Sequence, residues 1–182
     1  MNLPNKLTLA RILLIPVFVA ILEIAFPGQY LWAALVFAAA SFTDYLDGHI
    51  ARKYHLVTDF GKFADPLADK ILTTTALIYL VRMDLCHPIV LVIVIAREFA
   101  VSGVRMVAAG APGGKVIAAN MWGKAKTMLQ MVSVLVILVM LGVGSSYTPV
   151  VSHILMWAVG LLTLVSGVQY LWGNREFINT AK

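Results

Sequence analysis

Hydrophobic residues in this chain form six long runs, which are separated by short segments rich in glycine, proline or charged residues. Each run has about 20 residues, the length that an α-helix needs to cross the hydrocarbon core of a bilayer. We therefore expect an all-α, polytopic membrane protein with about six transmembrane helices. The segments between the runs are too short for another domain, so residues 1–182 should form a single membrane domain. The expected spans are approximately 5–26, 30–52, 61–82, 88–109, 119–143 and 149–172.

Two pairs of aspartates stand out, because the whole chain has only nine acidic residues. Asp44 and Asp47 lie near the end of the second run, and Asp65 and Asp69 lie in the third. Spacings of three and four place each pair on one helix face. Four carboxylates in one pocket would repel each other unless cations neutralise them, and Mg²⁺ and Mn²⁺ prefer carboxylate oxygens. Salt bridges with nearby lysines and arginines are the structural alternative, although burying four charges for stability alone is costly.

Small residues accompany the carboxylates on both predicted faces. Gly48 and Gly61 would let a bulky ligand lie against the helix backbone, and Arg52, one turn after Gly48, could meet an anionic group. Carboxylates that hold two metals about 4 Å apart suit phosphoryl transfer, in which one carboxylate can also serve as general base. The residues alone thus predict a metal-dependent membrane enzyme that acts on a phosphate ester or anhydride.

Composition and charge support a membrane location. Hydrophobic residues make up 60% of the chain and the mean hydropathy is +0.87, which argues against a soluble domain. On such a protein the net charge of +5 indicates loop topology and contact with anionic lipids rather than nucleic acid. Lysine and arginine gather at one set of run ends, whereas the opposite ends carry little beyond Arg82. We therefore expect a multi-pass protein of the cell (inner, cytoplasmic) membrane, with both termini and the acidic cluster on the cytoplasmic side.

The segment 44–69 resembles the signature of the CDP-alcohol phosphotransferase family, D-x2-D-G-x2-A-R-x8-G-x3-D-x3-D, and departs from it nowhere. This resemblance implies the six-helix CDP-alcohol phosphotransferase fold, usually a homodimer, over essentially the full length. It also implies attack of an alcohol oxygen on the β-phosphorus of a CDP-linked donor, with release of CMP. Two Mg²⁺ or Mn²⁺ per active site would be held by Asp44, Asp47, Asp65 and Asp69, of which Asp69 would also be the general base.

Donor binding is implied for residues in two parts of the chain. Near the N-terminus, Asn5, Thr8 and Arg11 recur at three-residue spacing and form one polar edge of the first span; Asn5 either caps the helix or contacts the nucleotide. The second part is the signature segment, residues 44–69. The expected CDP-diacylglycerol-binding residues are therefore Asn5, Thr8, Gly48, Arg52, Thr58 and Gly61.

The acceptor is indicated by flanking segments. Residues 2–18, 96–110 and 120–127 resemble the phosphatidylglycerophosphate synthases of that family, which join CDP-diacylglycerol to sn-glycerol 3-phosphate. A phosphorylated acceptor needs a basic pocket. Arg97 within an apolar run needs a partner, and we do not expect the adjacent Glu98 to face it. The candidate glycerol-3-phosphate-binding residues are Arg97, Arg105, Lys124 and Lys126; for the last three, snorkelling toward lipid phosphates is an open alternative.

Other functions remain as alternatives. A related enzyme of this family could use inositol phosphate, phosphatidylglycerol or serine as the acceptor. A small cation transporter would use the carboxylates as an intramembrane ion site, but it would place acidic residues near the middle of several spans. Here they cluster toward the expected cytoplasmic ends of two spans.

Overall fold

The computed structural model describes the backbone of residues 3–53, 59–110, 117 and 120–177, and the side chains of 5–43, 67–110, 117 and 120–177. Within these residues the regular structure is entirely helical, with six long helices and one short 3₁₀-helix, η1. The predicted all-α membrane fold is confirmed. The helices are α1 (Leu3–Glu23), α2 (Gln29–Lys53), α3 (Asp59–Arg82), α4 (Pro88–Gly110), α5 (Met121–Val143), α6 (Thr148–Gly173) and η1 (Arg175–Phe177).

Helix ends differ slightly from the expected span ends, for reasons that are local. The first helix ends at Glu23 rather than near residue 26, because a turn follows in which Gly28 adopts a φ of +80°, a conformation that favours glycine. The fifth begins at Met121, because the side chain of Asn120 accepts a hydrogen bond of 2.8 Å from the backbone N–H of Gly123 and so caps the helix.

Long apolar helices support the membrane assignment. In the described part of the chain, three helices are long and apolar enough to cross a membrane, namely Asn5–Glu23, Met121–Val143 and Thr148–Gly173. A shorter apolar stretch, Gln29–Thr43, precedes the acidic part of α2. Many large hydrophobic side chains on α4, α5 and α6 are exposed on the outside of the bundle, as expected where lipid replaces water.

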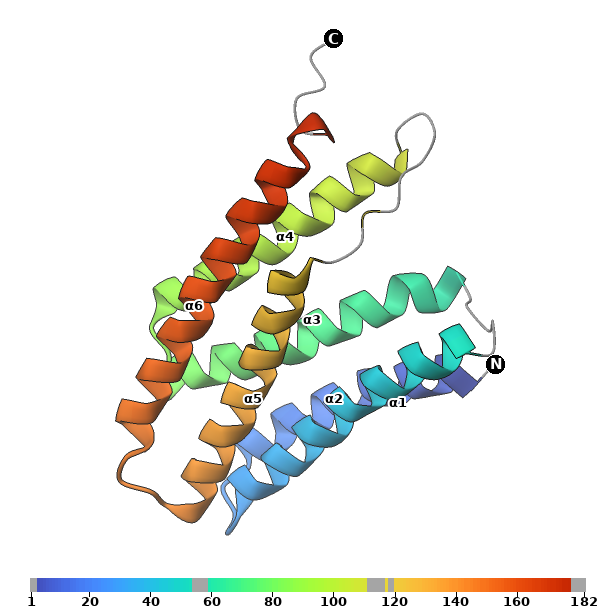
Figure 1. Cartoon of the computed structure of the whole chain (residues 1–182). Coiled ribbons are helices and arrows are strands. Elements are labelled where there is room, and N and C mark those ends of the chain that lie inside the picture. Colours follow the sequence, from blue (N-terminus) through green and yellow to red (C-terminus); the bar gives the residue numbers. More distant parts are fainter. Residues whose placement is uncertain (1–2, 54–58, 111–116, 118–119, 178–182) are drawn as a thin grey trace.

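The six helices form a bundle in which α1 and α2 pack antiparallel and α3 lies beside α1 (Figure 1). On the other side α4 packs on α6, and α5 contacts both α2 and α6. The start of α1, the end of α2 and the start of α3 lie together at one end of the bundle, on the right of Figure 1. This end therefore gathers the segments that carry the acidic signature.

The centre of the bundle is apolar, and a polar contact joins two helices at the end opposite the acidic signature. The rings of Phe18 and Phe37 meet with centroids 5.8 Å apart, between α1 and α2. At the far end, the Glu23 carboxylate accepts a hydrogen bond of 2.7 Å from the Tyr79 hydroxyl and another from the Arg82 guanidinium. This contact joins the end of α1 to the end of α3.

Candidate active site

The two acidic segments of the signature lie on neighbouring helices. The last three turns of α2 carry Asp44 and Asp47, and the first half of α3 carries Asp65 and Asp69. Both segments lie at the end of the bundle that also holds the start of α1 (Figure 1). The backbone thus brings the two aspartate pairs to one region. The predicted residues whose side chains lie outside the described ones are Asp44, Asp47, Gly48, Arg52, Thr58, Gly61 and Asp65.

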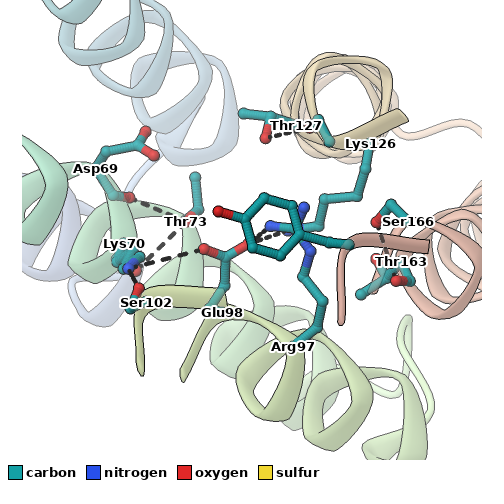
Figure 2. Close-up of polar contacts among 12 residues, drawn as sticks. Asp69, Lys70, Thr73, Arg97, Glu98, Ser102, Lys126, Thr127, Thr163 and Ser166 are labelled. Atoms are coloured by element: carbon teal, nitrogen blue, oxygen red, sulfur yellow. Dashed lines mark hydrogen bonds and ion pairs between the residues drawn. The ribbon is translucent and has the colours of Figure 1, made fainter. Parts of the chain in front are cut away.

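Asp69 is the one aspartate of the signature whose side chain is described. It is partly buried on α3, and its backbone carbonyl accepts a hydrogen bond of 2.9 Å from the Thr73 hydroxyl one turn later. Figure 2 shows its carboxylate beside a polar cluster that α3, α4 and α5 form together. Among the described residues there is no group of three or more His, Cys, Asp or Glu that could hold a metal ion. The predicted metal ligands therefore stay predictions.

Glu98 is the centre of this polar cluster (Figure 2). Its Oε1 accepts a hydrogen bond of 2.9 Å from Lys126 Nζ and another of 2.9 Å from Arg97 Nη1. Lys70 Nζ lies 4.0 Å from Glu98 Oε2 and also donates a hydrogen bond to the Ser102 hydroxyl. We call Lys70, Arg97, Glu98 and Lys126 the Glu98 cluster; its members come from three helices.

Three members of the Glu98 cluster are largely shielded from solvent, and the cluster has an excess of positive charge. The exposed fraction of the side chain is 3% for Lys126, 11% for Arg97 and 23% for Glu98, against 34% for Lys70. Three cations face the Glu98 carboxylate, and the Asp69 carboxylate also acts on Lys126, so these five groups keep a formal excess of one positive charge. Arg97 Nε is also buried and has no hydrogen-bond partner among the described residues. Because buried charges and donors are costly when unmatched, this arrangement favours an anionic ligand.

One expectation about Arg97 was wrong. We did not expect it to face the adjacent Glu98, yet the two side chains form a 2.9 Å ion pair. Neighbouring residues on a helix point in different directions at Cβ. However, the arginine and glutamate side chains each have several rotatable bonds, and both bend toward the space where Lys126 lies.

The other predicted acceptor residues lie in different surroundings. Arg105 donates a 3.1 Å hydrogen bond from Nε to the Tyr170 hydroxyl, and its guanidinium lies over the Tyr170 ring at 5.6 Å. Lys124 is exposed, whereas Lys126, two residues later on α5, is buried. The structure therefore brings Arg97 and Lys126 together around one carboxylate, and it places Arg105 against α6.

The polar edge of α1 is buried within the bundle. Thr8 and Arg11 are both 0% exposed, and Asn5 is partly buried. Arg11 Nε donates a 3.3 Å hydrogen bond to the carbonyl of Ala40 on α2. Ala40 lies one turn before Asp44, so this edge faces the part of α2 that leads into the signature.

Sequence reasoning missed the central place of Glu98 and did not include Lys70 among the candidate site residues. A signal was present, because an ionisable residue within an apolar run is a functional candidate by default. Glu98 was considered only as a partner for its neighbour Arg97. The spacing of residues along the chain could not show that Lys70 and Lys126, on two other helices, approach Glu98.

Comparison with known proteins gives a consistent picture over almost the whole chain. Residues 1–165 match the family model described as CDP-alcohol phosphatidyltransferase. The chain is similar to proteins named CDP-diacylglycerol–glycerol-3-phosphate 3-phosphatidyltransferase from several bacteria. It is 43% identical to that of Bacillus subtilis, with 99% of this chain and 98% of the relative covered. It is 41% identical to that of Rickettsia felis, with 97% of each covered, and 36% identical to that of Haemophilus influenzae, with 93% and 91% covered.

Proposed function

Because this chain belongs to the CDP-alcohol phosphatidyltransferase family, we propose that it transfers a phosphatidyl group from CDP-diacylglycerol to sn-glycerol 3-phosphate. The products are phosphatidylglycerophosphate and CMP, which places the enzyme in phospholipid biosynthesis. The observation that carries this proposal is the near full-length likeness to relatives named for that reaction. The cationic excess of the Glu98 cluster supports a phosphorylated acceptor over serine.

The enzymes of this family are metal-dependent, and the signature offers carboxylates of the kind that hard divalent cations prefer. We propose two Mg²⁺ or Mn²⁺ ions, held by Asp44, Asp47, Asp65 and Asp69 where α2 and α3 meet one end of the bundle. When bound, these ions would neutralise phosphate oxygens and the charge that develops on the leaving group.

The chain's own residues would then divide the remaining work. Asp69 would accept the proton of the acceptor hydroxyl as the alcohol oxygen attacks the β-phosphorus of the donor. The bond from that phosphorus to the CMP oxygen breaks, and CMP leaves. Arg97 and Lys126, supported by Arg105 and Lys124 nearer the surface, would hold the acceptor phosphate. The proposed contacts to CDP-diacylglycerol are Asn5, Thr8, Gly48, Arg52, Thr58 and Gly61.

We further propose that the enzyme lies in the cytoplasmic membrane as a homodimer, with both termini and the active site facing the cytoplasm. The distribution of lysine and arginine along the sequence supports this orientation, and the family resemblance supports the dimer. A reporter fused to the C-terminus, active only on the cytoplasmic side, would test the orientation.

One assay tests the function. The purified protein is incubated with CDP-diacylglycerol and Mg²⁺ and, in separate reactions, with glycerol 3-phosphate, inositol phosphate, serine or phosphatidylglycerol, and the lipid product is identified by mass. We expect phosphatidylglycerophosphate, together with one CMP per lipid. A phosphatidylinositol phosphate product without phosphatidylglycerophosphate would overturn the acceptor and leave the donor chemistry standing. Absence of CMP release with every acceptor would overturn the enzyme class.

A further inference from the structure

Glu98 lies within 4.0 Å of all three cations of the Glu98 cluster. Each cation comes from a different helix: Lys70 from α3, Arg97 from α4 and Lys126 from α5. Without a carboxylate between them, three positive charges in a shielded space would repel each other and separate. The approach of Arg97 and Lys126 to a common point therefore depends on Glu98.

Glu98 gathers these cations without using up their hydrogen-bonding capacity. A lysine ammonium has three N–H donors and an arginine guanidinium has five. Glu98 takes one from Lys126 and one from Arg97. Arg97 Nε stays buried without a partner in the described part of the chain. Donors thus remain for an anion that would lie against the same two side chains.

The Arg97 side chain is also confined by the backbone of two other helices. A Cβ added at Gly123 on α5 would lie 2.9 Å from Arg97 Nη2, and one added at Gly167 on α6 would lie 3.1 Å from Arg97 Cγ. Both distances are shorter than ordinary carbon contacts of about 3.5–4.0 Å. Arg97 therefore passes Gly167 at its Cγ and Gly123 at its Nη2 before it reaches Glu98, and a larger residue at either glycine would press on the side chain.

From this geometry we propose that Glu98 is a positioning residue for the acceptor: it holds the Arg97 guanidinium and the Lys126 ammonium in the arrangement that receives the phosphate of glycerol 3-phosphate. This inference rests on the proposed function. Glu98 does not touch the reacting atoms in this account, and it acts through the two cations. Its negative charge offsets the repulsion between the cations, and the net positive charge that remains suits an anionic phosphate.

The test compares Glu98→Gln and Glu98→Asp with a control at the opposite end of the bundle, Glu23→Gln. Glu23 is a suitable control because it also accepts hydrogen bonds from two side chains and also joins two helices. For each purified protein, KM and kcat are measured separately for glycerol 3-phosphate and for CDP-diacylglycerol, and Tm is measured with and without glycerol 3-phosphate. A role limited to stability would lower Tm without moving one KM selectively.

For Glu98→Gln we expect KM for glycerol 3-phosphate to rise about tenfold or more, since a misplacement of about 1 Å in a binding group can cost up to about 10²-fold. KM for CDP-diacylglycerol should stay within twofold, and the increase in Tm caused by glycerol 3-phosphate should be lost. Glu98→Asp, which keeps the charge on a shorter side chain, should restore part of the acceptor affinity. Glu23→Gln should lower Tm and leave both KM values within twofold.

Unchanged acceptor KM in Glu98→Gln, or an equal rise in both KM values, would overturn the positioning role. If Glu98→Gln fails to fold, Glu98→Asp decides by the same criterion, because it too alters the distance to both cations. Failure of the proposed function looks different, since the wild-type protein would then make no phosphatidylglycerophosphate. If the wild type makes that product and the Glu98 variants retain its acceptor KM, the function stands and this inference falls.

Discussion

Gly123→Ala tests the acceptor site without removing any charged group. The new Cβ would lie 2.9 Å from Arg97 Nη2 and 3.0 Å from Asn120 Oδ1. Ordinary contacts are about 3.5–4.0 Å, so the guanidinium must move by roughly 0.5–1 Å. The obstructing atom is the far end of a flexible side chain, so the helix itself need not shift. The substitution therefore displaces one cation of the Glu98 cluster and leaves the fold in place.

The expected effects on stability and activity differ in size. Alanine is favoured over glycine in a helix by up to about 1 kcal/mol, while weakening the Asn120 cap could cost about 1 kcal/mol. The free energy of unfolding should thus change by no more than about 1 kcal/mol in either direction. Misplacement of a substrate-positioning group by about 1 Å can cost up to about 10²-fold in rate. We expect kcat/KM for glycerol 3-phosphate to fall about 10- to 100-fold.

The assay measures initial rates of CMP release at varied glycerol 3-phosphate and saturating CDP-diacylglycerol, together with Tm. Gly103→Ala is the matched control, because it places the same substitution on α4 where an added Cβ would meet nothing within 4 Å. Its kcat/KM should equal that of the wild type. If Gly123→Ala and Gly103→Ala differ by less than twofold in kcat/KM, Arg97 does not bind the acceptor where we place it.

Four further predictions follow from the signature and from the single cysteine. Asp44→Asn or Asp65→Asn should remove most activity from a folded protein, and EDTA should do the same reversibly in the wild type; full turnover without divalent ions would contradict the metal site. Asp69→Asn should lower kcat by about 10² or more with little change in donor affinity, and a near-normal kcat would place the base elsewhere. Arg52→Ala should weaken CDP-diacylglycerol binding by about 1.5–3 kcal/mol in a direct binding measurement, and unchanged affinity would remove it from the donor site. Burial raises the pKa of the thiol of Cys86, in the loop that joins α3 to α4, to about 11. Alkylation by iodoacetamide should therefore be slow at pH 8 and accelerate toward pH 11, whereas rapid labelling of the folded protein at pH 7 would refute this.

The order and extent of the helices could be predicted from the sequence, because the length of an apolar run and the residues that interrupt it are local properties. The run that ends at Arg82 and the one that begins at Pro88 match α3 and α4 at those residues. The same holds for the faces of α2 and α3. A spacing of three or four places Asp44 with Asp47, and Asp65 with Asp69, on one face of any helix that they join. Their roles as ligands remain predictions.

What the sequence could not decide is how side chains from different helices meet. The pairing of Glu98 with Lys126 and Lys70 depends on the rotation and crossing of α3, α4 and α5, and no spacing along the chain encodes it. The same applies to Arg11 on the polar edge of the first span, which lies in the α1–α2 interface at 0% exposure and donates a hydrogen bond to the Ala40 carbonyl. Periodicity fixes which residues of one helix share a face, because that geometry repeats along a single backbone. Only packing between helices decides which faces meet, and in a membrane it must also bring each buried charge to a partner, because lipid offers none.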